Sequence, residues 1–256
     1  MELAPSAFET VFETGEAAES VTVIVPLYNY GHYVTGALRS VLSQSLDSVG
    51  VIVIDDASTD DSCGIAADWA AKHAESFQSI RVIKHRENQG LSRTRNTGIA
   101  LSKSPFLFFL DSDNEIYPRC LEVHLNALSG NDAAFAYSIL EKFGSDTGLI
   151  GTEVFNRDRL KRGNYIDAMA CIRREILVAL GGYRFFEHGW EDYDLWLRVC
   201  ELGQTGIHIP EILGRYRVHA RSMLRTTTNR RDIQTKLRDQ LTADYPWLEL
   251  PQVWDW

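Results

Sequence analysis

The feature that most constrains the fold is an alternation of short apolar runs with amphipathic segments between residues 21 and 113. The runs predict buried strands over residues 21–26, 51–54, 80–83 and 106–110. Apolar residues at helical spacing predict helices over about residues 34–42, from about residue 61, and over residues 92–101. Strands that are apolar throughout are buried on both faces, as in a parallel sheet covered by helices. The alternation therefore predicts an α/β fold with a mostly parallel central sheet.

Polar residues follow three of these runs, at the point where each predicted strand ends. Tyr28 follows the first strand, Asp55 and Asp56 follow the second, and Asp111-Ser112-Asp113 follow the fourth. Ligands of open α/β sheets bind beyond the carboxyl ends of the strands. We therefore expect the ligand site at this edge.

Composition excludes several other classes of protein. The 256 residues carry 26 Lys and Arg against 35 Asp and Glu, a net charge of −9, which argues against a nucleic-acid partner. Apolar residues make up 45% of the chain, which excludes general disorder. No stretch reaches the roughly 18 apolar residues of a membrane-spanning helix, and the four scattered cysteines predict buried thiols rather than a zinc site. We expect a soluble, cytoplasmic protein, with peripheral contact at the inner face of the membrane left open.

Asp111 and Asp113 are candidate metal ligands. Alternate residues of an extended segment point the same way, so the two carboxylates would face one point. Mg²⁺ and Mn²⁺ take oxygen ligands, often one or two carboxylates together with substrate phosphates. The alternative is that both residues only solvate a turn or cap a helix.

Two further segments suggest nucleotide contacts. A carboxylate at a strand end, such as Asp55 or Asp56, can accept hydrogen bonds from a base or a ribose, or can simply belong to a turn. Gly90 before a predicted helix allows close approach of the backbone to a ligand, and Arg93 and Arg95 can pair with phosphate. The alternative for this segment is a solvated loop with a basic first turn.

The segment Gly189–Arg198 contains candidate acid–base groups. Successive helical residues diverge by about 100°, so one of Glu191 and Asp192 is expected to face a cleft. Beside Trp190, such a carboxylate would be placed as a general base next to a stacked sugar ring. Alternatively, these acids only favour the dipole of the helix that they begin.

Together these segments resemble the inverting glycosyltransferases of family 2, which have the GT-A fold. The resemblance implies a Rossmann-like nucleotide-binding half with a mostly parallel central sheet, fused to an acceptor-binding half. The matching stretches, in that family's order, are VTVIVPLYNYGHYVTGALRSVLSQS, VIVIDDASTDDS, ENQGLSRTRNTGIALS, FLFFLDSDNEIYP, GGY, GWEDYDLWLRV and YRVHARSM.

The resemblance also implies roles for single residues. Asp192 would be the catalytic base, and Glu191 would help to place the acceptor. Asp113 would bind the metal, with Asp111 and His219 as further residues of the metal or diphosphate site. Arg215, Arg217 or the C-terminal tail could add cationic help at the diphosphate. The residues implied to bind the nucleotide sugar are Pro26, Tyr28, Asp56, Arg95, Asp111 and Ser112, with Tyr28 against the base, Asp56 hydrogen-bonded to it and Asp111 near the ribose.

The activity implied by the resemblance is a metal-dependent, inverting sugar transfer in polysaccharide or glycoconjugate biosynthesis. The donor would be a nucleoside-diphosphate sugar, with UDP-sugars favoured, the metal Mn²⁺ or Mg²⁺, and the acceptor a carbohydrate or lipid-linked sugar. A non-catalytic nucleotide-sugar-binding protein is one alternative, but it would lack the base or the metal acid, and Asp192 and Asp113 are both present. A sugar-phosphate nucleotidyltransferase is another, but residues 27–30 lack its Gly-rich phosphate loop.

The domain organisation predicted from these patterns has three parts. Residues 1–20 are expected to be a flexible leader. Residues 21–223 would be the GT-A catalytic domain, with a nucleotide-sugar-binding half at 21–115 and an acceptor-binding half at 116–223. Residues 224–256 would be a basic, aromatic-ended tail, whose apolar stripe of Ile233, Leu237 and Leu241 either packs on the catalytic domain, which we favour, or docks on an anionic membrane.

Overall fold

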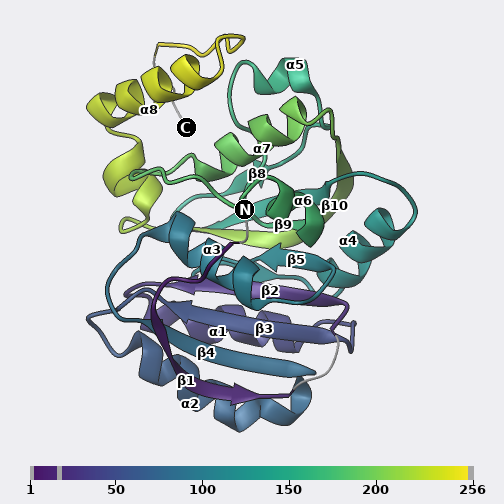
Figure 1. Ribbon diagram of the computed structural model, residues 1–256, viewed down its shortest axis with the longest axis vertical. Helices are drawn as coiled ribbons and strands as arrows, with labels where there is room; N and C mark the ends of the chain where they lie inside the picture. The colour runs from purple at the N-terminus through teal and green to yellow at the C-terminus, as the bar shows by residue number, and fades with distance from the viewer. Residues whose placement is uncertain (1–2, 16–18, 253–256) are drawn as a thin grey trace.

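The computed structural model describes residues 3–15 and 19–252, which form one ten-stranded sheet with helices on both faces (Figure 1). The strands are β1 (Phe8–Thr14), β2 (Val21–Leu27), β3 (Val49–Asp55), β4 (Ser79–His85), β5 (Phe106–Phe109), β6 (Glu115–Ile116), β7 (Phe135–Gly144), β8 (Gly148–Ile150), β9 (Ala170–Arg173) and β10 (Gly206–Val218). The main helices are α1 (Gly31–Leu42), α2 (Ser62–His73), α3 (Leu91–Leu101), α4 (Cys120–Ser129), α5 (Arg157–Leu160), α6 (Arg174–Ala179), α7 (Glu191–Glu201) and α8 (Arg231–Asp244). The strand order is β1-β4-β3-β2-β5-β9-β7-β10-β6, and β8 pairs with β7.

The parallel half of the sheet agrees with the prediction from the sequence. β2 lies in the middle and pairs in parallel with β3 and with β5, while β4 pairs in parallel with β3. The four predicted strands and the three predicted helices all occur, with ends that differ by a few residues. Because all four strands run the same way, their carboxyl ends meet along one edge.

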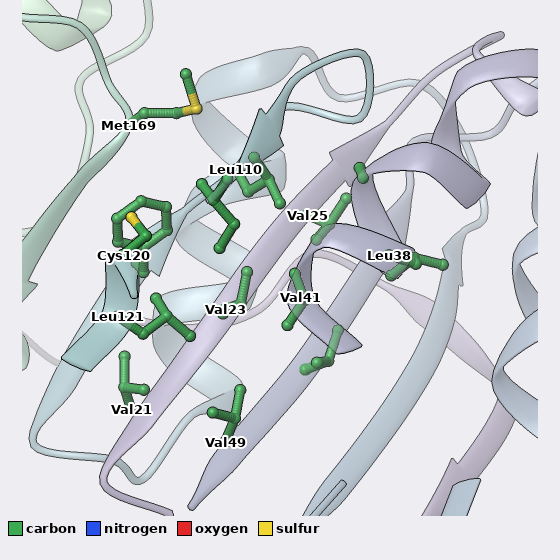
Figure 2. Close-up of a cluster of buried hydrophobic side chains, with 14 of the residues drawn as sticks. Val21, Val23, Val25, Leu38, Val41, Val49, Leu110, Cys120, Leu121 and Met169 are labelled. Carbon is green, nitrogen blue, oxygen red and sulfur yellow. The ribbon is translucent and has the colours of Figure 1, made fainter. Parts of the chain in front are cut away.

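Helices on the two faces of the sheet enclose two separate apolar cores. Val23 and Val25 of β2 pack with Leu38 of α1 in the first core (Figure 2). Ile24, on the opposite face of the same strand, belongs to the second core, together with residues of α3, α6, α7 and α8. The approach of α3 to β2 requires glycine at position 98, because a Cβ there would lie 2.6 Å from Ile24 Cγ2. Burial on both faces explains why the strands are continuous apolar runs.

The expectation of a flexible leader over residues 1–20 is wrong for residues 8–14. These residues form β1, which pairs antiparallel with β4 from Phe8 opposite His85 to Thr14 opposite Ile80. Phe8 packs against the second core and Phe12 against the first, and Glu13 forms an ion pair with Arg81. The apolar residues Phe8, Val11 and Phe12 do not alternate with the polar ones, and the register with β4 shifts between Thr10 and Phe12. The segment therefore lacks the period-2 pattern by which a strand is recognised, and its acidic composition obscured it further.

The second half of the chain extends the sheet with strands of mixed direction. β9 is antiparallel to β5 and to β7, and β10 is parallel to β7. The boundary predicted after residue 115 falls inside β6. No strand was predicted at β10. Pro210 lies inside β10, and its register with β7 shifts between Ile209 and Gly214, because proline cannot donate to the ladder.

The C-terminal segment packs on the body of the protein, as we favoured from its apolar stripe. Ile233, Leu237 and Leu241 of α8 are buried in the second core. In Figure 1, α8 lies at the end of the molecule opposite β1 and α2. Trp254 and Trp256, the aromatic end of the predicted tail, lie outside the described residues. Across residues 3–15 and 19–252, the helices are too short or too polar to span a membrane.

Candidate functional site

The residues selected from the sequence gather at the carboxyl ends of the parallel strands. Pro26 is buried near the end of β2, and Tyr28 follows with 46% of its surface exposed. Asp56 follows β3, and the segment Asp111–Asp113 follows β5. The second half of the chain adds the start of α7 and the end of β10 to the same site. The evidence is that charges from the two halves interact: Asp113 with His219, and Asp192 with Arg95.

Asp56 is held almost entirely by the protein itself. Its carboxylate accepts hydrogen bonds from the backbone N–H groups of Gln89 and Gly90, each at 2.8 Å, and His85 Nδ1 lies 2.7 Å from Oδ1. Burial by itself would raise the pKa of this carboxyl, but these bonds outweigh it and hold the pKa below the ordinary value. Asp56 therefore fixes the loop that precedes α3, which leaves it little capacity to bind a base directly.

Asp111, Ser112 and Asp113 form a turn rather than the extended segment that we expected. The N–H of Asn114 donates to the carbonyl of Asp111 at 3.0 Å and closes this turn. The two carboxylates consequently have different partners: Asp111 binds Arg95, and Asp113 binds His219. They still influence each other, since burial and the nearby charge of Asp111 raise the pKa of Asp113, partly offset by His219. Ser112 is buried between them.

Asp113 and His219 form the candidate metal site. Asp113 Oδ2 lies 2.9 Å from His219 Nε2, and each side chain is 12% exposed. Two contacts hold the turn against β10: Arg217 Nε donates to the carbonyl of Asp113, and the Arg217 N–H donates to Asn114 Oδ1, both at 2.8 Å. Asn114 thus helps to hold Asp113 in place. An acid at position 114 would instead add negative charge to the site.

These donors fit a divalent cation that is shared with a substrate. In the part of the chain that the structure describes, no three His, Cys, Asp or Glu side chains are grouped as a metal site. Mg²⁺ typically takes only one or two carboxylates from the protein and completes its shell with phosphate oxygens and water. Asp113 supplies one such carboxylate and His219 adds an imidazole nitrogen, whereas Asp111 is bound to Arg95.

Arg95 lies at the centre of the site instead of reaching toward the solvent. It is 1% exposed, and its two terminal nitrogens bind Asp111 at 2.8 Å and Glu191 at 2.5 Å. Its guanidinium carbon also lies 5.2 Å from the centre of the Tyr183 ring. Because both terminal nitrogens of Arg95 bind carboxylates, they are not available to bind a diphosphate. Arg95 instead connects Asp111, which follows β5, with Glu191 of α7.

Asp192 is the more exposed of the two acids that begin α7. Glu191 is 4% exposed and faces Arg95, while Asp192 is partly exposed and accepts a hydrogen bond from Asn164 Nδ2 at 3.1 Å. Desolvation and the charges of Glu191 and Asp167 raise the pKa of Asp192 to about 8. A carboxyl group with this pKa can accept a proton near neutral pH.

Asn164 and Asp167 are site residues that the sequence analysis missed. Desolvation raises the pKa of Asp167 to about 7, and the charges of Asp111 and Asp113 act in the same direction. Asp167 is therefore close enough to the candidate metal acids and to the candidate base for its charge to interact with both. Both missed residues precede β9, in the irregular region where the apolar pattern is weakest, so no periodic signal pointed to them.

Two features suggested by the sequence have structural roles instead. Trp190, expected beside a stacked sugar ring, is only 6% exposed and packs in the second core. Arg215 and Arg217, considered as cationic help for a diphosphate, pair with Glu115 at 2.8 and 2.9 Å. The four cysteines are free and buried, as predicted.

A family model described as "Glycosyl transferase family 2" matches residues 22–192. The uncharacterized glycosyltransferase YibD of Escherichia coli K12 is 34% identical over 106 residues, which are 41% of this chain and 29% of that protein. The chain therefore spans less than a third of the length of this curated relative.

Two solved structures show the same fold at low sequence identity. S. aureus TarS 1–349 in complex with UDP-GlcNAc matches with a TM-score of 0.74 and 16% identity over 91% of this chain and 68% of that one. The mannosyltransferase PcManGT from Pyrobaculum calidifontis, in complex with GDP-Man and Mn²⁺, matches with a TM-score of 0.66 and 19% identity over 89% of this chain and 64% of that one. These similarities confirm the predicted fold class, a GT-A fold with a largely parallel central sheet.

Proposed function

The chain belongs to glycosyl transferase family 2, and from this premise we propose that it transfers a sugar from a nucleoside-diphosphate sugar to a hydroxyl group, with inversion at the anomeric carbon. One observation carries the proposal: a carboxyl group suited to act as a base shares a site with the Asp113–His219 pair. Asp167 connects the two, because its charge interacts with Asp113 on one side and with Asp192 on the other.

Asp192 is proposed to accept the proton of the acceptor hydroxyl. Its Oδ2 is oriented by Asn164 and its Oδ1 by the N–H of Tyr193 at 2.7 Å. As the proton moves to the carboxylate, the hydroxyl oxygen bonds to the anomeric carbon from the face opposite the diphosphate. The bond to the diphosphate oxygen breaks as the new bond forms, and the diphosphate oxygen keeps the electron pair. A divalent cation held by Asp113 and His219 would stabilise the negative charge on the departing diphosphate.

Glu191 is proposed to help to place the acceptor. Its Oε1 binds Arg95, whereas Oε2 is buried and has no hydrogen-bond partner among the described residues. A buried carboxylate oxygen without a partner is costly, and an acceptor hydroxyl beside Asp192 would satisfy it.

On the donor side, we propose that Pro26 and Tyr28 line the nucleoside pocket and that Asp111 and Ser112 lie near the ribose. Asp56 contributes by holding the loop before α3. UDP-sugars are the favoured donors, with Mn²⁺ or Mg²⁺ as the metal. Because the two similar structures contain UDP-GlcNAc and GDP-Man, both bases belong in the first screen.

The acceptor is proposed to be a carbohydrate or a lipid-linked sugar in polysaccharide or glycoconjugate biosynthesis, reached by peripheral contact with an anionic membrane. The exposed cations Arg225, Arg231 and Lys236 support that contact. The contact would be electrostatic, because the apolar stripe of α8 is buried against the second core. Co-sedimentation with phosphatidylserine vesicles should decrease for the double variant Arg231→Glu, Lys236→Glu. Equal binding by the wild type and this variant would contradict the contact.

The decisive experiment is calorimetric titration of UDP, GDP and TDP, each with and without Mn²⁺. We expect one nucleotide to bind in a metal-dependent manner, and Asp113→Ala to lose the metal dependence. That nucleotide then selects the donor sugars for a transfer assay. If none of the three nucleotides binds, the proposed donor site is wrong.

A further inference from the structure

The turn that leads into α7 has a backbone conformation that needs support from its surroundings. Gly189 has a φ of 102°, and Trp190, with a large side chain, has a φ of 68°. Residues other than glycine keep this left-handed conformation only where neighbouring contacts hold it, and such residues are frequent at functional sites. Asp192 follows Trp190 by two positions, so the geometry of this turn sets the position of the proposed base.

Thr228 contacts this turn from the C-terminal segment. Its side chain is buried, and Oγ1 donates a hydrogen bond to the carbonyl of His188 at 2.6 Å. The contact is close: a Cβ at position 189 would lie 2.9 Å from Thr228 Oγ1. Glycine is therefore required at 189 both by its positive φ and by the neighbouring threonine.

Tyr245, directly after α8, also contacts the first turn of α7. Its hydroxyl donates to Asp194 Oδ1 at 2.8 Å, and Asp194 is fully buried. Arg184 binds the same oxygen at 3.1 Å and also pairs with Asp244 of α8 at 2.5 Å, while Arg198 binds Asp194 Oδ2 at 2.8 Å. A buried carboxylate depends strongly on such partners, so Asp194 fastens α8 to the helix that carries Asp192.

Thr228 and Tyr245 both lie beyond residues 22–192, the part of the chain that the family model covers. We infer that residues 224–245 brace the start of α7, and that Thr228 and Tyr245 are positioning residues for Asp192. The inference deepens the proposed function, on which its catalytic part rests. Thr228 acts through the backbone of His188, and Tyr245 acts through the side chain of Asp194.

The test compares variants that remove one hydroxyl each. Thr228→Val and Tyr245→Phe remove the two hydrogen bonds, whereas Thr228→Ser keeps the first. Thr235→Val is the matched control, because Thr235 is exposed on α8 and its hydroxyl donates to the carbonyl of Arg231 within the same helix. Two measurements are made on the full chain: amide hydrogen exchange over residues 188–195, and kcat and KM for the donor.

We expect Thr228→Val and Tyr245→Phe to increase exchange over residues 188–195 about fivefold, as the loss of one hydrogen bond allows, with no change in β2 and β3. The same variants should lower kcat about tenfold at an unchanged donor KM, because the base is displaced while the donor site is intact. Thr228→Ser and Thr235→Val should behave as the wild type.

Two results would overturn the brace. One is wild-type exchange and wild-type kcat in both hydroxyl-deleted variants. The other is faster exchange throughout the sheet together with an equal loss in Thr228→Ser, which would show a role in global stability only. If the wild type transfers no sugar at all, the proposed function fails, and the exchange measurement alone decides whether residues 224–245 hold the turn.

Discussion

Arg95 of α3 and Glu191 of α7 form a buried ion pair, with Arg95 Nη1 2.5 Å from Glu191 Oε1, although the two residues are 96 positions apart. The other terminal nitrogen of Arg95 binds Asp111. One guanidinium thus connects the carboxylate that follows β5 with the helix that carries the proposed base. Arg95 also places positive charge near Asp192, where it lowers the pKa of that carboxyl against the effect of Glu191 and Asp167.

Replacing Arg95 with methionine should therefore affect both stability and the pH profile. The change leaves two carboxylates without their buried counter-charge, and we expect the free energy of unfolding to fall by about 3–5 kcal/mol. Urea denaturation measures this loss. Any remaining activity should require a higher pH than in the wild type, because the pKa of Asp192 rises further. Arg93→Met is the control and should leave both quantities nearly unchanged, because Arg93 lies two residues earlier in α3 and is exposed.

The pH dependence of transfer should report the ionisation of Asp192. The base acts as a carboxylate, and its pKa is raised to about 8, so kcat/KM should fall as the pH is lowered below about 8. Asp192→Asn should reduce transfer by about 10²–10⁴-fold and leave nucleotide binding intact. Near-wild-type transfer by this variant would show that Asp192 is not the base.

The same pKa shift predicts a change in stability. A carboxyl group whose pKa is raised on folding stabilises the folded state most at acidic pH, and this contribution is lost as the pH rises from the ordinary value of 3.8 to about 8. The free energy of unfolding should therefore fall less between pH 4 and pH 8 in Asp192→Asn than in the wild type. Urea denaturation at both pH values tests this, and an equal loss in wild type and variant would contradict the raised pKa.

His219→Ala should weaken the metal-dependent part of nucleotide binding. His219 is the partner of Asp113, so we expect the affinity for Mn²⁺ in the presence of nucleotide to fall about tenfold or more, while metal-free binding is unaffected. Calorimetry with and without Mn²⁺ separates the two. His73→Ala is the control, since His73 lies at the end of α2 and contacts Trp69. Unchanged Mn²⁺ affinity in His219→Ala would remove His219 from the metal site.

The edge strand β1 should contribute measurably to stability. Phe12 is partly buried against the first core, so Phe12→Ala should lower the free energy of unfolding by about 1–3 kcal/mol, less than at a fully buried phenylalanine. Val11→Ala is the control, because Val11 is 42% exposed and should matter little. Thermal or urea denaturation compares the two, and equal stability would mean that β1 is dispensable to the fold.

The sequence analysis found some strands and missed others for a physical reason. β2, β3, β4 and β5 are buried on both faces, and their apolar runs are therefore visible in the sequence. β1 and β10 escaped because one is a half-exposed edge strand of acidic composition and the other is interrupted by Pro210. Asn164 and Asp167 escaped because they lie in irregular segments, where no periodicity connects a residue to its neighbours in space.

The sequence by itself determined the parallel α/β core, the edge on which the site lies and the family to which its motifs are similar, because these depend on local periodicity and on short motifs. Only the tertiary structure decided which charges meet. It places Arg95 between Asp111 and Glu191, turns Asp56 toward its own loop and brings Asp167 within reach of the charges of Asp113 and Asp192. It also decided that α8 and Tyr245 fasten the start of α7. Electrostatic interactions depend on distance and burial, and neither quantity is encoded at any single position of the chain.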